Sequence, residues 1–235
     1  EMTELVRVIV ENGIGELVLN RPQQRNSLIG PLVWEMQSGL EKLEKDEGCN
    51  SIVIRGEQGY FCAGLDLKAF SQDPPPDWRS RFQDDWAKFH KTIFISNKPI
   101  VGALQGFAIA GGSALALACD FLVVGEGSFM HVSEVERNMM APINIFWLQL
   151  RHSYHRALKM ALLGERHYGE SLLNLGIADR CVPESEVLGA AREIAGRFAG
   201  FNGGNVRQLK YSIRSACVHQ DFDELLASIK QSMQV

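Results

Sequence analysis

Two short glycine-containing segments and one isolated carboxylate are the parts of this sequence that could do chemistry. Residues 61–68 read FCAGLDLK and residues 106–114 read GFAIAGGSA, and in each the small residues follow a strand-like run and precede a helix-like one. A turn of this kind leaves backbone N–H groups without partners at the start of a helix, where they stabilise negative charge. Two such turns converging on one carbonyl oxygen would form an oxyanion hole, a pair of donors for charge that develops on that oxygen.

Glu134 is the acidic residue that best fits a role beside these turns. It lies in residues 129–136, FMHVSEVE. A glutamate that is partly removed from water has its pKa raised toward neutrality, so that it can both remove and return a proton. Glu136 and His131 stay open as alternative bases, although Glu136 points away from Glu134 if the segment is helical, because residues three or four apart share a helix face.

The order and spacing of these motifs, together with LNRP at residues 19–22, resembles the crotonase superfamily of enoyl-CoA hydratases and isomerases. The resemblance extends from about residue 5 to about residue 230. It implies an α/β fold built as a spiral of ββα units, followed by a C-terminal helical region that mediates trimerisation. It also implies an acyl-CoA substrate and no separate cofactor, because coenzyme A is part of the thioester.

The resemblance implies roles for particular residues of this chain. The backbone N–H groups of Leu65 and Gly111 would be the oxyanion donors, and Glu134 would be the base. Arg25 and Lys68 would contact the phosphates and adenine of CoA. The full set of candidate substrate-binding residues is Arg25, Ala63, Gly64, Asp66, Leu67, Lys68, Gly112 and Ala114.

Ala114 departs from the hydratase pattern. The hydratases that this chain resembles use two glutamates, the first of them three residues after the oxyanion-hole glycine, where this chain has Ala114. A methyl group cannot activate water. Glu134 stands at the place of the second glutamate, which is the only one that mitochondrial-type Δ3,Δ2-enoyl-CoA isomerases keep, and a single carboxylate suffices for a 1,3-proton shift. We therefore expect enoyl-CoA isomerisation, with another acyl-CoA hydrolase, lyase or decarboxylase, or a non-catalytic CoA-binding protein, as alternatives.

Hydrophobic periodicity indicates the elements that must position these residues. Alternating or β-branched runs predict strands at residues 5–10, 16–20, 51–55, 100–104, 121–124 and 177–182. Apolar stripes at helical spacing predict helices that start at Pro31, at 78 and at 111, and again at 184–198, 205–218 and 222–233. The alternation of strands and helices predicts α/β architecture, which we divide into a core at 1–183 and a C-terminal helical region at 184–235.

Composition excludes several classes of protein. The 235 residues are 46% hydrophobic, enough for a sizeable core. A net charge of −4 argues against a general nucleic-acid binder. The five scattered cysteines contain no CxxC pair, which argues against a disulfide scaffold or a metal site, and no apolar run is long enough for a membrane span. We expect a cytoplasmic homotrimer or dimer of trimers, with the mitochondrial matrix left open because an N-terminal segment can be missing.

Overall fold

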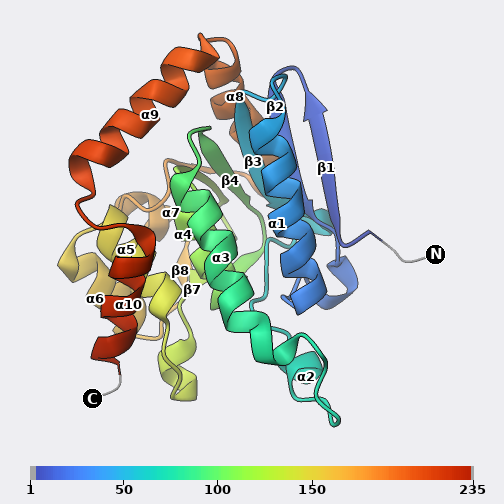
Figure 1. Ribbon diagram of the computed structural model, residues 1–235, viewed down its shortest axis with the longest axis vertical. Coiled ribbons are helices and arrows are strands. Elements are labelled where there is room, and N and C mark those ends of the chain that lie inside the picture. Colours follow the sequence, from blue (N-terminus) through green and yellow to red (C-terminus); the bar gives the residue numbers. More distant parts are fainter. Residues whose placement is uncertain (1–3, 234–235) are drawn as a thin grey trace.

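The computed structural model describes residues 4–233, which form two β-sheets surrounded by helices (Figure 1). The larger sheet has the strand order β1-β2-β3-β4-β6-β9 and the smaller one the order β5-β7-β8. The strands of the larger sheet are β1 (Val6–Glu11), β2 (Ile14–Leu19), β3 (Ser51–Gly56), β4 (Ile100–Leu104), β6 (Phe121–Gly125) and β9 (Arg180–Val182). The smaller sheet contains β5 (Phe107–Ile109), β7 (Phe129–His131) and β8 (His167–Tyr168).

The larger sheet agrees with the strands predicted from the sequence. β1 and β2 form an antiparallel hairpin whose turn places Asn12 and Gly13 at positive φ, as expected for an Asn-Gly turn. From β2 to β9 the neighbouring strands are parallel. The three strands of the smaller sheet, β5, β7 and β8, are not among the predicted strands, because runs of two or three residues are too short to show a period.

The predicted helices are all present, and the structure adds helices at Leu67–Phe70, Pro142–Arg151, Tyr154–Leu162 and Gly169–Asn174. α1 begins at Gly30 with Pro31 in its first turn, where a missing N–H costs nothing. The helix predicted from residue 78 begins as a short 3-10 turn at Arg79–Arg81 and becomes α-helical at Phe82. The helices are α1 (Gly30–Lys45), α2 (Leu67–Phe70), α3 (Phe82–Ile95), α4 (Gly111–Ala118), α5 (Pro142–Arg151), α6 (Tyr154–Leu162), α7 (Gly169–Asn174), α8 (Val187–Ala199), α9 (Gly203–Cys217) and α10 (Phe222–Ser232).

Both faces of the larger sheet are covered. Ile52 and Ile54 of β3 point into the main core, which α1 and α3 help to build. Val53 points the other way, into a separate apolar cluster with Ala191 and Ala195 of α8. α8 therefore packs on the sheet although it belongs to the segment assigned to the C-terminal region, and the boundary at 183/184 stays a prediction.

The chain repeats one order of elements as it moves along the sheet. β4 in the larger sheet leads to β5 in the smaller sheet and then to α4, and β6 leads likewise to β7 and then to α5. Each repeat carries the chain from one sheet to the other and then into a helix. The α/β architecture predicted from the sequence is confirmed.

α9 stands apart from the other helices at the edge of the molecule (Figure 1). It has no buried residue, and Leu209 and Ile213 are each 63% exposed. Lys210 holds it to the body of the molecule, with Nζ 2.6 Å from Oδ2 of Asp120. The trimer that the sequence predicts would need such an apolar face, and it stays a prediction. No helix in the described part of the chain is both long and apolar enough to cross a lipid bilayer.

Candidate active site

Three parallel segments end side by side and bring the sequence motifs together. Cys62 and Ile109 are linked through backbone hydrogen bonds, because the Ile109 N–H donates to the Cys62 carbonyl at 3.1 Å. On the other side of β5, Ile109 pairs in register with His131 of β7. The loops that follow these three segments contain Leu65, Gly111 and Glu134, so that the motifs converge at one edge of the smaller sheet.

Glycines allow the first two turns to touch. Gly64 has a φ of +81°, and a Cβ added there would lie 2.6 Å from the Ile109 carbonyl oxygen. A Cβ on Gly112 would lie 2.2 Å from the Cys62 carbonyl oxygen. Any side chain at these two positions would push the backbones of the turns apart. Gly64 and Gly112 therefore shape the site, although neither lines its cavity.

The two candidate oxyanion donors are backbone N–H groups that the fold leaves without acceptors. Leu28 accepts from the Asp66 N–H at 2.9 Å and donates to the Gly64 carbonyl at 2.7 Å, so that the pairing skips the N–H of Leu65. Gly111 is the first residue of α4, where an N–H has no partner within its helix. Across residues 4–233, neither N–H donates a hydrogen bond.

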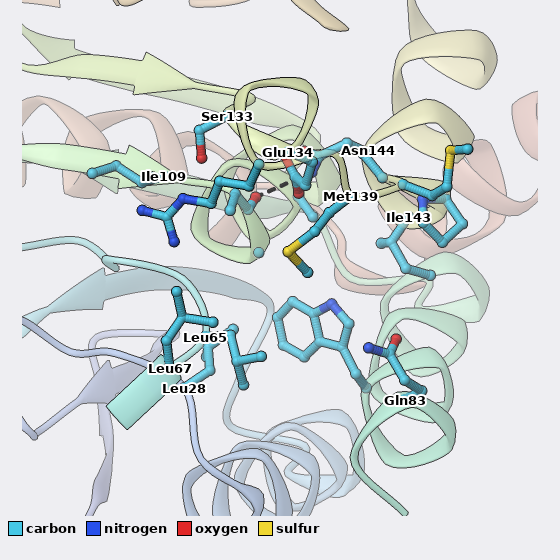
Figure 2. Close-up of a pocket in the computed structure, with 18 of the residues that line it drawn as sticks. Leu28, Leu65, Leu67, Gln83, Ile109, Ser133, Glu134, Met139, Ile143 and Asn144 are labelled. Atoms are coloured by element: carbon cyan, nitrogen blue, oxygen red, sulfur yellow. Dashed lines mark hydrogen bonds between the residues drawn. The ribbon is translucent and has the colours of Figure 1, made fainter. Parts of the chain in front are cut away.

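Leu65, Gly111 and Glu134 line one cavity of about 110 Å³. Figure 2 shows it between the first turn on one side and Glu134 with Asn144 on the other. The apolar residues that complete its wall come from α2, α3, β5, α5 and the loops before α1 and α5, and they include Leu28, Leu67, Phe82, Trp86, Ile109, Met139, Met140 and Ile143. Gln83, Ser133 and Arg137 add polar groups. The cavity thus combines a largely apolar wall with two backbone N–H groups and one carboxylate.

Glu134 carries the only carboxylate among the described residues that line this cavity. Its side chain is 9% exposed, and burial raises the pKa of the carboxyl group above its ordinary value. Oε1 accepts a hydrogen bond from Nδ2 of Asn144 at 2.9 Å, which lowers the pKa in part. Oε2 is buried without a partner in the described chain. A carboxylate whose pKa is raised in this way is a stronger base once it is ionised.

The alternative catalytic groups lie elsewhere. Nε2 of His131 is 3.0 Å from the Gly164 carbonyl oxygen and 3.3 Å from Oε2 of Glu136. Neither residue lines the cavity. Burial raises the pKa of the Cys62 thiol to about 12, which leaves no thiolate to act as a nucleophile. Within residues 4–233, no three His, Cys, Asp or Glu side chains are grouped to hold a metal ion.

The two candidate CoA-binding cations lie on the surface beside the first turn. Arg25 is exposed, and its carbonyl accepts from the Ala63 N–H at 3.1 Å. Lys68 is exposed in α2. Neither lines the cavity, and their contact with CoA stays a prediction.

Asp66 is used within the fold. Burial alone would raise its pKa, but hydrogen bonds from the Ala69 N–H and the ion pair with Arg21, 2.8 Å away, hold the pKa below its ordinary value. Its N–H is bonded to Leu28. Asp66 therefore caps α2 and anchors the first turn, and its carboxylate is engaged.

Ala114 lines the cavity one helical turn after Gly111 and is fully buried. The position that holds the first glutamate in the hydratases this chain resembles is therefore part of the cavity wall, and here it carries only a methyl group. The sequence motifs, in contrast, do not identify Asn144 as a site residue. Its only sequence signal is that a polar residue stands in the apolar stretch PINIFWL of α5.

Comparisons with known proteins bear on the family and the fold of this chain. The sequence profile of the family described as Enoyl-CoA hydratase/isomerase matches residues 10–233. An Arabidopsis thaliana protein named "Probable enoyl-CoA hydratase 1, peroxisomal" is 30% identical over 215 residues, which cover 88% of this chain and 77% of the relative. "Enoyl-CoA delta isomerase 1, mitochondrial" from Rattus norvegicus is 29% identical over 204 residues, or 82% and 68% of the two chains. The crystal structure of enoyl-CoA hydratase from Mycobacterium smegmatis superimposes with a TM-score of 0.79 at 27% identity, covering 98% and 97% of the two chains.

Proposed function

The chain belongs to the enoyl-CoA hydratase/isomerase family and has the crotonase fold, and on that premise we propose that it moves a double bond along an enoyl-CoA from C3 to C2. Glu134 is the single acid–base group in this proposal. The backbone N–H groups of Leu65 and Gly111 stabilise the oxygen of the thioester.

The reaction consists of two proton transfers. The Glu134 carboxylate removes a proton from C2, which the neighbouring thioester makes acidic. The resulting dienolate carries its negative charge on the thioester oxygen, where the two N–H donors stabilise it. The Glu134 carboxylic acid then returns the proton to C4, which leaves the double bond between C2 and C3 and regenerates the carboxylate.

The observation that carries this proposal is the count of carboxylates at the cavity. Glu134 supplies the only one among the described residues, and Ala114 offers none. Hydration by a pair of carboxylates needs a second acid–base group to handle water, whereas a 1,3-proton shift needs one group that works twice. Relatives named hydratases and a relative named an isomerase both match this chain, so the matches do not favour either reaction. The single carboxylate at the cavity is what supports isomerisation over hydration.

The test is the effect of Glu134→Gln on turnover of 3-enoyl-CoA, followed by absorbance of the conjugated thioester. We expect a loss on the order of 10²–10⁴-fold, the usual contribution of a positioned general base. Solvent deuterium exchange at C2 should vanish in the same variant, while CoA thioester binding persists. Glu136→Gln is the matched control, because that carboxylate lies outside the cavity, and it should keep wild-type turnover.

Three outcomes would reject this assignment. Near-wild-type turnover by Glu134→Gln would place the base elsewhere. Faster conversion of 2-enoyl-CoA to a hydroxyacyl-CoA than of 3-enoyl-CoA would favour a hydratase or another acyl-CoA enzyme. Binding of acyl-CoA with neither exchange nor turnover would favour a non-catalytic CoA-binding protein.

We further propose that the protein assembles as a homotrimer or a dimer of trimers. The exposed Leu209 and Ile213 of α9 support this, since apolar side chains that protrude together favour burial against a partner. A monomer in light scattering at micromolar concentration would contradict it.

A further inference from the structure

We infer that Asn144 is a positioning residue that holds both the general base and the peptide group of the second oxyanion donor, an inference that rests on the proposed roles of Glu134 and Gly111. Asn144 lies in the first turn of α5 and is 2% exposed. Its Nδ2 donates to Oε1 of Glu134 at 2.9 Å and to the carbonyl oxygen of Ala110 at 3.1 Å. One side-chain amide thus bridges two of the three loops that build the site (Figure 2).

The chemistry of the two acceptors fixes the orientation of this amide. An asparagine NH₂ group has two hydrogens, and here each has an acceptor, a carboxylate oxygen and a carbonyl oxygen. A reversed amide would place Oδ1 against both oxygens and lose both bonds. The bridge between Glu134 and Ala110 therefore has one arrangement.

Asn144 constrains the base. The hydrogen bond to Oε1 restricts the rotation of the Glu134 carboxylate and leaves Oε2 as its unpartnered oxygen. The same bond favours the ionised form of Glu134 against the burial that disfavours it. Removing the donor should therefore make the base harder to ionise as well as less well placed.

Asn144 also constrains the second oxyanion donor. Ala110 has φ +50° and ψ −113°, a conformation that L-residues rarely adopt and that surrounding contacts must maintain. A peptide bond is planar, so the direction of the Ala110 carbonyl sets the opposite direction of the Gly111 N–H. The Asn144 donor holds that carbonyl and polarises the peptide, which strengthens the Gly111 N–H as a donor.

A purely structural role explains this side chain poorly. Asn144 does not cap its own helix, since α5 begins after Ala141 without a side-chain cap. Its Oδ1 is buried without a partner in the described chain, and leaving such a group unpaired costs stability. An apolar side chain of similar size would suit the core of α5 better, so both of its bonds point to the site.

Asn144→Leu tests the inference, because leucine fills similar space without donors. We expect kcat for 3-enoyl-CoA to fall by about 10–100-fold, the scale of a misplaced catalytic group, while KM changes less than about threefold. The acid limb of kcat/KM against pH should move to higher pH. Asn144→Asp, nearly identical in shape, should move it further, because a second carboxylate then faces Glu134.

Ile145→Ala is the matched control. Ile145 lies next along α5 and packs against the core without bonding to Glu134 or Ala110, so that its truncation weakens the packing of α5 and should leave the acid limb unmoved. A folded Asn144→Leu variant with wild-type kcat and an unmoved acid limb would overturn the inference.

A second measurement uses the wild-type protein and does not depend on whether a variant folds. The side-chain amide resonances of Asn144 should titrate in NMR with the same midpoint as the acid limb, and the titration should be absent in Glu134→Gln. Resonances insensitive to pH would overturn the inference. Wild-type turnover by Glu134→Gln is a different result, because it rejects the proposed function itself.

Discussion

The backbone N–H of Ala110 donates a hydrogen bond to the carbonyl oxygen of His131, with 2.9 Å between nitrogen and oxygen. This contact joins the ends of β5 and β7. Gly111 comes two residues after the end of β5, and Glu134 comes three residues after the end of β7. The candidate donor and the candidate base are therefore placed by one continuous backbone ladder. The hydrogen bonds from Asn144 then orient the Glu134 carboxylate and the Ala110 carbonyl.

Activity should depend on pH through Glu134. Burial raises the pKa of its carboxyl group above the ordinary value of 4.5, and only the ionised form can remove a proton from C2. We expect kcat/KM, which reports the free enzyme, to fall as the pH drops through this raised pKa. Measurement from pH 4.5 to pH 9 with 3-enoyl-CoA gives the midpoint, and activity that stays level down to pH 4.5 would contradict the assignment.

Stability should depend on the same group in the opposite sense. Below the unfolded-state pKa, Glu134 is protonated in both states and the raised pKa contributes nothing. As the pH rises through the folded-state pKa, the folded protein must hold a buried charge and loses stability. Glu134→Gln should therefore have a higher Tm than wild type at pH 8, by a margin that shrinks toward pH 4.5.

Calorimetry at several pH values tests this difference, and Glu47→Gln is the control. Glu47 is exposed, so its neutralisation should change Tm little at every pH. A constant Tm difference for Glu134→Gln across the range would show that the folded-state pKa is not raised.

Gly112→Ala should separate the two turns. The added Cβ would lie 2.2 Å from the Cys62 carbonyl oxygen, so the backbone must move at an expected cost of about 1–3 kcal/mol. Turnover should fall as Gly111 is displaced. Gly189→Ala in α8 is the matched control, because nothing lies within 4 Å of its added methyl, and it should gain about 0.5–1 kcal/mol. Urea unfolding compares the two, and equal stabilities would refute the close contact.

Ala114→Glu should add hydration activity. Ala114 is fully buried and lines the cavity, so a carboxylate there could handle water while facing the substrate. Conversion of 2-enoyl-CoA to the hydroxyacyl-CoA should rise at least about tenfold, below the 10²–10⁴-fold of a well-positioned acid–base group. Ala114→Gln has the same size without the charge, and a rise of the same extent in that variant would exclude the carboxylate as its cause.

Lys210→Met should loosen α9. Lys210 reaches Oδ2 of Asp120 at 2.6 Å and the Lys98 carbonyl oxygen at 2.7 Å, and its loss removes both of these hydrogen bonds between α9 and the body of the molecule. We expect a loss of about 1–3 kcal/mol and faster proteolysis around residue 202. Lys42→Met is the control, since Lys42 is exposed on α1. Unchanged proteolysis would show that α9 is held by other contacts.

Sequence alone predicts the long elements and the two glycine turns, because periodicity and turn residues act locally. α1 is predicted with its buried face intact, including Leu32 and Met36. β5 could not be predicted, because its three residues are strand only through pairing with Cys62 on one side and β7 on the other. That pairing is set by the whole fold.

The same limit explains which site residues the sequence predicts. Leu65, Gly111 and Glu134 have positions within motifs, and the structure brings them to one cavity. Asn144 of α5 and Trp86 of α3 line the cavity because each helix turns that face toward it, and each looks like an ordinary core position in the sequence. Whether Leu65 and Gly111 stabilise an oxyanion stays a prediction that ligand binding must test.

If main-chain N–H groups are the donors, as proposed, the protein can vary in a particular way. Another apolar residue in place of Leu65 would then reshape the cavity while the proposed donor remains, so that substrate preference would change independently of charge stabilisation. Mutating side chains one at a time would therefore reduce activity at Glu134 and at the glycines, but it would not reveal the donor role of Leu65. An ester in place of the amide that carries the Leu65 N–H, introduced by backbone synthesis, would make that donor visible.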